Sequence, residues 1–238
     1  MSLTVSLDKG RVCWTRMQAE AGEGLARIVH RKDLERRAGN GIFFWGVGNA
    51  PSRAIPALAR AGAVIEVLFS VMKSKPKAQD IAPSRVVVWQ SYVDLDGVVR
   101  PIPPNVLVTS RANSRNHHYA LICHSDIALD VSDQGPFDVS AYRNYGAGGA
   151  VGASQVTALL ERCAPDETPE YRVAMRARLT GGLWVKLVEP TEVAGPAMAE
   201  IEQEPADEKA WLELVRRVRS DIHTAAPERQ CQATLFPI

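Results

Sequence analysis

The sequence has almost no net charge, no close pair of cysteines and no long apolar run. Its 238 residues carry 28 Lys and Arg against 27 Asp and Glu, a net charge of +1. Such a chain has no global field that draws it to nucleic acid or to an acidic membrane, so any contact with nucleic acid must come from a local basic patch. No run approaches eighteen apolar residues, and the first residues lack an apolar signal core. We therefore expect a soluble, cytoplasmic protein without membrane contact.

Cysteines and conventional catalytic sets are also sparse. The four cysteines, at 13, 123, 163 and 231, form no C-x-x-C pair, which argues against a zinc knuckle or a disulfide scaffold. His124, Ser125 and Asp126 are consecutive, but neighbours on a strand point to opposite faces. We assign no catalytic residue and no metal ligand, and we favour a binding protein over an enzyme.

What the sequence does contain is an ordinary apolar fraction of 46% and several β-rich runs. These features predict an α+β domain over residues 1–190, built on a curved, mainly antiparallel sheet with flanking helices. The expected strands cover 42–45, 64–69, 85–89, 98–102, 106–109 and 118–123, with a hairpin of 171–179 and 183–189 around Thr180-Gly-Gly182. The expected helices cover 15–37, 49–62, 155–163 and 211–222.

The composition changes after Pro190, where Ala, Glu and Pro dominate. This predicts an acidic linker over 191–208, followed by a C-terminal helix and tail over 209–238.

One segment resembles a known domain. The stretch Phe44-Trp45-Gly46-Val47-Gly48-Asn49, followed by a predicted helix and a strand that ends in Phe69-Ser70, resembles the start of EVE-domain proteins. These are relatives of YTH domains within the PUA-like superfamily. The resemblance covers residues 44–70 and implies a PUA-like β-barrel whose cleft holds a flipped or single-stranded base, often a modified one.

The same resemblance implies roles for particular residues. Trp45 would be a stacking wall for the base, Asn49 a reader of its edge, and Ser70 a residue of the cleft, with Arg53 contributing to nucleic-acid binding. The sequence departs from the family pattern at Gly62-Ala63, where a Gly-Asp pair is usual. The alternative for Trp45, which follows two phenylalanines, is a place in the hydrophobic core.

Lysines alternate in the loop after this segment. Lys73 and Lys75 stand on either side of Ser74, in a stretch without strand or helix periodicity. Loop lysines beside a base-binding cleft would contact phosphates and position a strand without reading its sequence. The alternative is a solvated loop with no ligand.

The end of the sequence resembles another motif. Gln232, Leu235 and Phe236 have the form Q-x-x-L-F, which is similar to the clamp-binding peptide of bacterial DNA-transacting proteins. The resemblance implies docking on the DNA sliding clamp, with Leu235 and Phe236 as buried anchors and Gln232 as the polar contact. Blocking the clamp would then be an activity in itself, as in a replication inhibitor. The alternative is a tail that packs on its own core.

A glycine-rich stretch gives a competing hypothesis. Arg143, Gly146 and Gly148 fit the form R-x-x-G-x-G, Gly149 follows directly, and a helix is predicted over 155–163. Backbone N–H groups in a loop that enters a helix form a pyrophosphate site. The pattern resembles the loop with which GNAT acyltransferases hold acetyl-CoA, and its alternative is a plain glycine-rich connection.

The sequence thus favours a nucleic-acid-associated binding protein that docks on the sliding clamp and reads a modified or extruded base of DNA or RNA. It needs no cofactor under this hypothesis. A GNAT-like acyltransferase that uses acetyl-CoA is the second hypothesis, and an interaction protein without nucleic acid is the third. The identity of the base and the oligomeric state stay open.

Overall fold

The computed structural model describes ten stretches of the chain. They cover residues 7–18, 24–48, 54–71, 85–111, 119–132, 136–137, 139–152, 155–163, 171–194 and 205–232. The following predicted site residues lie outside these ranges: Asn49, Arg53, Lys73, Lys75, Leu235 and Phe236. Gln232 is the last residue of a described helix, but its side chain is outside the description.

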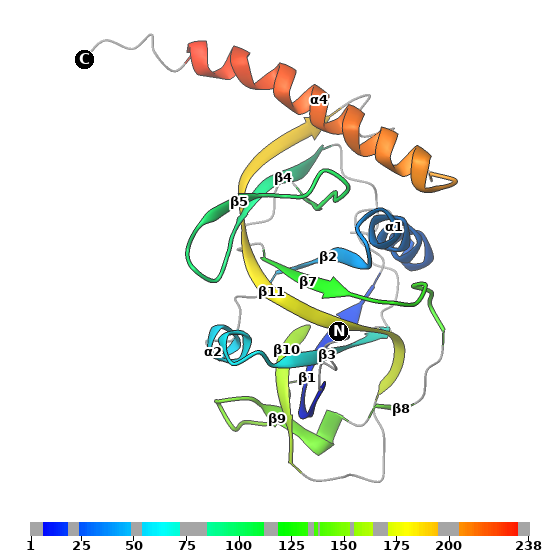
Figure 1. Ribbon diagram of the computed structural model, residues 1–238, viewed down its shortest axis with the longest axis vertical. Coiled ribbons are helices and arrows are strands. Elements are labelled where there is room, and N and C mark those ends of the chain that lie inside the picture. Colours follow the sequence, from blue (N-terminus) through cyan, green and yellow to red (C-terminus); the bar gives the residue numbers. More distant parts are fainter. Residues whose placement is uncertain are drawn as a thin grey trace, which may run out of the picture.

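A sheet dominates the described chain, and three α-helices flank it (Figure 1). The strands are β1 (Leu7–Met17), β2 (Ile42–Val47), β3 (Val64–Val71), β4 (Arg85–Val93), β5 (Val99–Pro101), β6 (Thr109–Arg111), β7 (Tyr119–His124), β8 (Pro136–Phe137), β9 (Tyr142–Asn144), β10 (Thr157–Arg162) and β11 (Tyr171–Ala194). The helices are α1 (Leu25–Ala38), α2 (Ile55–Arg60) and α4 (Glu208–Gln232). The predicted α+β class, rich in sheet, is confirmed.

The strands follow the order β2-β7-β11-β3-β1-β10-β9, and β4 joins β11 with β5 and β6 at its other edge. The described pairs are antiparallel except β1 with β3, which are parallel. The path ends at β2 and β9, which do not pair with each other in the described residues, so the sheet is not closed there. None of the helices in these ranges has the length and apolarity that a membrane crossing requires.

The predicted hairpin over 171–189 is wrong, because β11 is one strand of 24 residues. It pairs in turn with β3, β7 and β4 and curves through the whole sheet (Figure 1). Its register with β7 shifts between Leu179 and Trp184, where Thr180-Gly-Gly182 stands. Glycines inside a strand often mark a bulge or a bend, so this segment bends the strand and does not reverse it.

Three other boundaries also need correction. Residues 15–17, expected in a helix, belong to β1, and residues 191–194, expected in the linker, belong to β11 and pair with β4. The C-terminal helix was expected to end at 222, but α4 continues to Gln232. The last of these errors follows from reading the polar, proline-containing end of the chain as a tail.

The helix predicted over 155–163 is instead the strand β10, which pairs with β1 and β9. Its apolar residues Ala158, Leu159 and Leu160 are buried as a continuous run. A short apolar run fits a buried strand and a helix equally well by periodicity, and here the pairing with two neighbours decides.

The sheet is covered by apolar clusters on both faces. In β2, Phe43 and Trp45 belong to one cluster with residues of α1 and α2, whereas Phe44 packs on the other face with Ile102 and Val106. A strand buried on both faces reads as a continuous apolar run, which is why 42–45 was recognised from the sequence. A further cluster joins α4 to α1 and β4, so the C-terminal helix is part of this packed body.

Candidate functional site

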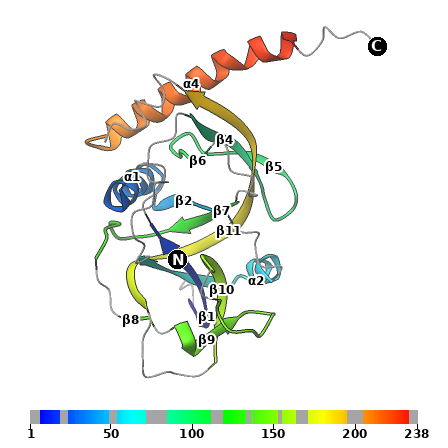
Figure 2. The ribbon, with the colours of Figure 1, turned by 180° about the vertical axis from the view of Figure 1, so that it is seen from behind.

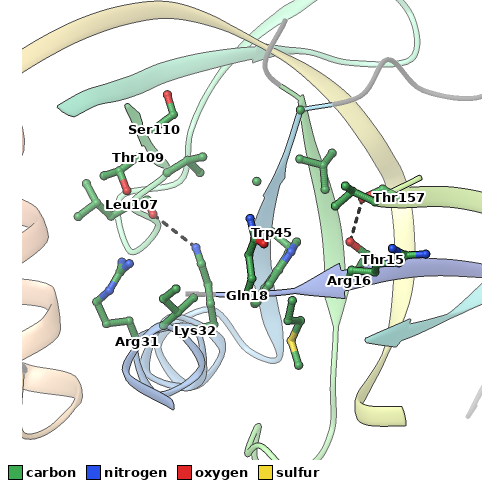
Figure 3. Close-up of a pocket in the computed structure, with 17 residues that line it drawn as sticks. Thr15, Arg16, Gln18, Arg31, Lys32, Trp45, Leu107, Thr109, Ser110 and Thr157 are labelled. Carbon is green, nitrogen blue, oxygen red and sulfur yellow. Dashed lines mark hydrogen bonds between the residues drawn. The ribbon is translucent and has the colours of Figure 1, made fainter. Parts of the chain in front are cut away.

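A cavity of about 240 Å³ opens between α1 and the ends of several strands (Figure 3). Its wall is formed by residues 15–18 at the end of β1, 45–48 at the end of β2, 107–110 around the start of β6, 156–157 at the start of β10, and Ile28, Arg31 and Lys32 of α1. The wall therefore brings together segments that are far apart in the sequence.

Trp45 has a place in both the core and the cavity. Its side chain is 8% exposed and meets Phe69 edge to face, with 5.0 Å between the ring centroids. The rest of the indole lines the cavity, and Figure 3 shows it in the middle of the wall. The two alternatives for this residue are thus not exclusive, since the core fixes the ring whose remaining surface faces the cavity.

The helix α1 supplies buried charge to the same wall. Arg31 and Lys32 are 5% and 6% exposed, and both line the cavity. The Lys32 Nζ atom lies 2.9 Å from Glu35 Oε2 and donates to the Leu107 carbonyl at 3.4 Å. A buried ammonium is stable only when paired and hydrogen-bonded, and both conditions hold for Lys32.

Glu35 links this charge to the strand that carries Trp45. Its Oε1 atom accepts a hydrogen bond of 2.5 Å from the backbone N–H of Phe44, and its Oε2 atom pairs with Lys32. Burial raises the pKa of the Glu35 carboxyl, while Lys32, Phe44 and Arg31 act in the opposite direction. One carboxylate thus fixes the spacing between α1 and β2, and with it the width of the cavity.

Hydroxyl groups complete the polar wall. Thr15 and Thr157 share a hydrogen bond of 2.8 Å between their Oγ1 atoms. One hydroxyl of such a pair keeps a proton that it can donate to a ligand. Thr109 stands on the opposite side, and its neighbour Ser110 accepts a hydrogen bond of 3.1 Å from Trp89 Nε1.

The charged residues of the cavity wall are all cations. Among the described lining residues there is no Asp or Glu, whereas Arg16, Arg31 and Lys32 are cations and Trp45 carries an indole N–H. These groups donate hydrogen bonds and carry positive charge. The cavity is therefore suited to a ligand that is rich in acceptors or negatively charged and has a flat apolar part.

The wall at 107–110 is held in place by α4. Arg219 donates to the carbonyls of Ile102, Pro103 and Val106 at 3.2, 2.8 and 2.9 Å. Trp211 Nε1 donates to the Asn105 carbonyl at 2.8 Å. Segment 102–106 is thus clamped immediately before the residues that line the cavity.

Of the two predicted base-binding residues that the structure describes, Trp45 lines the cavity and Ser70 does not. Ser70 is fully buried and accepts a hydrogen bond of 3.1 Å from Trp14 Nε1. It follows Phe69 on β3, and neighbours on a strand point to opposite faces, so Ser70 lies on the other face from Trp45.

The glycine-rich stretch lies elsewhere and has a different form from the one expected. Asn144 and Leu160 are paired across β9 and β10, so the stretch is the tip of a β-hairpin that leads into a strand and not into a helix. The Asn144 side chain donates to the carbonyls of Gly149 and Ala150 at 3.3 and 3.0 Å, and Gly148 N–H donates to the Asn144 carbonyl. The helix start on which the acyltransferase hypothesis relied is thus replaced by a strand, and the hypothesis itself stays a prediction.

The other predicted residues of that loop have structural roles within the hairpin. Gly146 and Gly148 have φ of +79° and +67°, and both values fall in the left-handed region that favours glycine. Gly149 adds no such constraint, and Arg143 pairs with Glu161 across the strands and bridges to Ala150. The glycines make the hairpin turn possible.

The sequence analysis missed Arg31 and Lys32, although a signal was present. Leu25, Ile28 and Val29 form an apolar stripe along α1, and Lys32 continues it at the same helical spacing. A charged residue on an apolar stripe is a candidate for a buried, partnered charge.

Comparison with other proteins adds no assignment: no family model, no curated protein and no solved structure matches this chain. Within the described ranges, no three His, Cys, Asp or Glu side chains gather as a metal ion would require.

Proposed function

We propose that this chain is a nucleic-acid-associated binding protein whose cavity receives a single base of a DNA or RNA strand. The observation that carries the proposal is the presence of Trp45, Arg31 and Lys32 in one cavity. An aromatic wall offers a surface for a base, and the cations favour the polyanion to which the base belongs. The open, curved sheet would then be a variant of a PUA-like barrel.

The size of the cavity supports a single nucleotide unit and not a longer segment. Pockets for drug-sized ligands are roughly 300–1,000 Å³. The volume of about 240 Å³ is below this range, so it suits one base with the groups attached to it. A base inside it would have to leave its stack, which costs least in single strands and at mismatched or damaged pairs. The proposal therefore predicts a preference for single-stranded or lesion-containing substrates.

A leucine at position 46 tests this use of the cavity. Gly46 lines it, and a Cβ atom there would meet Val108 Cγ1 at 3.9 Å, an ordinary contact. Gly46→Leu should fill the cavity and weaken oligonucleotide binding by about tenfold or more, which corresponds to about 1.4 kcal/mol. Gly46→Ala should have a small effect. Fluorescence anisotropy with labelled single-stranded DNA and RNA, and with duplexes with and without a mismatch, measures the change.

A matched glycine on the hairpin gives the control. Gly149 has no atom within 4 Å of an added Cβ, and it lies outside the cavity. Gly149→Leu should bind oligonucleotides like the wild type. Equal affinities for all these variants would mean that nucleic acid does not enter the cavity, and undetectable binding by the wild-type protein would refute the proposed function.

We also propose that the segment after α4 docks on the bacterial DNA sliding clamp. Helix α4 has 25 residues, about 37 Å at 1.5 Å per residue. Figures 1 and 2 show its last turns extending beyond the sheet, which supports access of a partner to its end. Leu235→Ala with Phe236→Ala should abolish clamp binding in surface plasmon resonance and leave the melting temperature unchanged. A melting temperature lowered by several degrees would instead indicate that the tail packs on its own core.

A further inference from the structure

We propose that Arg31, Lys32 and Thr109 form a phosphate subsite in the cavity, so that the preferred ligand is a nucleotide and not a bare base. This inference rests on the proposed function and makes its ligand class more specific. It concerns the side of the cavity formed by α1 and by the segment that enters β6.

The first argument is electrostatic. Arg31, Lys32 and Glu35 are the buried charged residues among those described, so two cations accompany one carboxylate. The carboxylate does not line the cavity, whereas both cations do. The cavity wall therefore has a net positive charge in a position that is shielded from water, where electrostatic attraction for an anion is strongest.

The second argument is the placement of donors. Figure 3 shows Arg31 and Lys32 rising from α1 on one side of the cavity, with Leu107 and Thr109 opposite them. The Lys32 ammonium is held at the wall by its bonds to Glu35 and to the Leu107 carbonyl, so its positive charge has a fixed position there. The guanidinium of Arg31 is planar and has a forked set of donors that fits a phosphate.

The third argument is the separation of this subsite from the aromatic part. Trp45 and the Thr15–Thr157 hydroxyl pair lie on the β1 and β2 side in Figure 3, away from Arg31. Arg16 lies on the same side, but its guanidinium stands over the Trp14 ring, 4.8 Å from the ring centroid. A ligand with a flat ring at one end and a charged group at the other would satisfy both sides. A nucleotide has this form, with its base toward Trp45 and its phosphate toward Arg31.

The experiment compares nucleosides with the corresponding nucleoside 5′-monophosphates by isothermal titration calorimetry on the full chain. For the wild type, the phosphate should increase affinity about tenfold or more, as charge-assisted hydrogen bonds do. Arg31→Met should remove most of this increase, so that the ratio of nucleotide to nucleoside affinity falls toward one, and Arg31→Lys should restore part of the ratio. Equal wild-type affinity for nucleoside and nucleotide would overturn the subsite.

A second pair of variants addresses the hydroxyl without altering a buried charge. Thr109→Val keeps the shape and removes the donor, so it should reduce nucleotide affinity by a larger factor than nucleoside affinity. Ser132 lies outside the cavity and its hydroxyl bonds to Asp130, so Ser132→Ala is the control without an effect on the ligand. If both variants bind nucleotides like the wild type, Thr109 is not part of the subsite.

Two further ligands distinguish a phosphate that belongs to a nucleic-acid strand from the phosphate of a free nucleotide. An oligonucleotide with a neutral methylphosphonate beside the inserted base should lose affinity if the phosphate belongs to a strand. Stronger binding of the free monophosphate than of the oligonucleotide would identify a free nucleotide. If oligonucleotides bind and Gly46→Leu weakens them, but the phosphate adds nothing, only the subsite fails; if nothing binds, the proposed function fails as well.

Discussion

Two glycine-containing segments stood out in the sequence, and the structure uses them in different ways. The segment Trp45–Gly48 ends β2 and forms part of a cavity wall, with the Trp45 ring fixed by Phe69. The segment Asn144–Gly149 forms a hairpin tip whose polar groups bond to one another. Both have the small residues that allow close approach of a ligand, but only the first lies beside buried charge.

The difference lies in where the polar groups find their partners. In the hairpin, Asn144 bonds to Gly149, Ala150 and Gln155, all within the same surface loop. Around the cavity, partners come from distant parts of the chain, as in the contacts of Lys32 with Leu107 and of Thr15 with Thr157. A loop whose polar groups hydrogen-bond to one another can form from local contacts. A cavity wall instead depends on the tertiary structure and presents polar groups to a ligand.

Glu35→Gln should have the largest effect, because it breaks the charge pair beside the cavity. The glutamine keeps an acceptor for Phe44 N–H but leaves Lys32 buried without its carboxylate. Breaking a buried pair costs about 3–5 kcal/mol of unfolding free energy. Urea denaturation followed by circular dichroism measures the loss. A loss below about 1 kcal/mol would show that Lys32 is well solvated in the variant, as it would be at a surface site.

The double variant Lys32→Met, Glu35→Gln separates charge from shape. Replacing both charges with neutral side chains of similar volume is often close to neutral for stability. The double variant should therefore recover most of the stability lost by Glu35→Gln alone. It should not recover ligand affinity, since Lys32 lines the cavity.

Much of the fold could be predicted from the sequence because its signals are local. The apolar run at 42–45, the β-rich runs at 64–69 and 85–89, and the apolar face of 211–222 all correspond to observed elements. The errors arose where a tertiary pairing overrides a local pattern. Thr180-Gly-Gly182 has the composition of a turn, but pairing with β3, β7 and β4 keeps β11 continuous.

The candidate site was less predictable than the fold. Trp45 could be singled out because a tryptophan next to glycines is conspicuous, but its neighbours in the cavity come from 15–18, 107–110 and 156–157. Nothing local in those segments indicates a shared wall. Lys32 was visible only as a charge on an apolar stripe, a pattern whose meaning depends on the residues packed against it.

Arg219→Met, which changes the support of the cavity wall, should have an effect on stability between those of Glu35→Gln and Asn144→Ala. The variant keeps an apolar stem but removes three hydrogen bonds to the carbonyls of segment 102–106, which precedes the cavity wall. Burial lowers the pKa of the Arg219 guanidinium, so relief of that desolvation offsets part of the loss. We expect a decrease of about 2 kcal/mol in unfolding free energy in urea.

The control for Arg219 lies one turn earlier on the same helix. Arg216 is exposed and pairs with Glu213 on the helix surface. Arg216→Met should change the unfolding free energy by less than about 0.5 kcal/mol, because exposed pairs contribute little. Equal effects of the two variants would mean that α4 is held by its apolar face alone, without the Arg219 contacts.

Asn144→Ala should have the smallest effect and tests the hairpin side of the comparison. The change removes the side-chain bonds to Gly149 and Ala150 and the bond from Gln155, all at the surface. Because water can replace these partners, we expect a loss of about 1 kcal/mol in urea and no change in oligonucleotide affinity. Asn144→Asp keeps the acceptor for Gln155 and should lose less. A loss of oligonucleotide affinity in Asn144→Ala would show that the hairpin also contacts the ligand. The hairpin, whose polar groups bond to one another, would then not differ from the cavity wall in ligand binding.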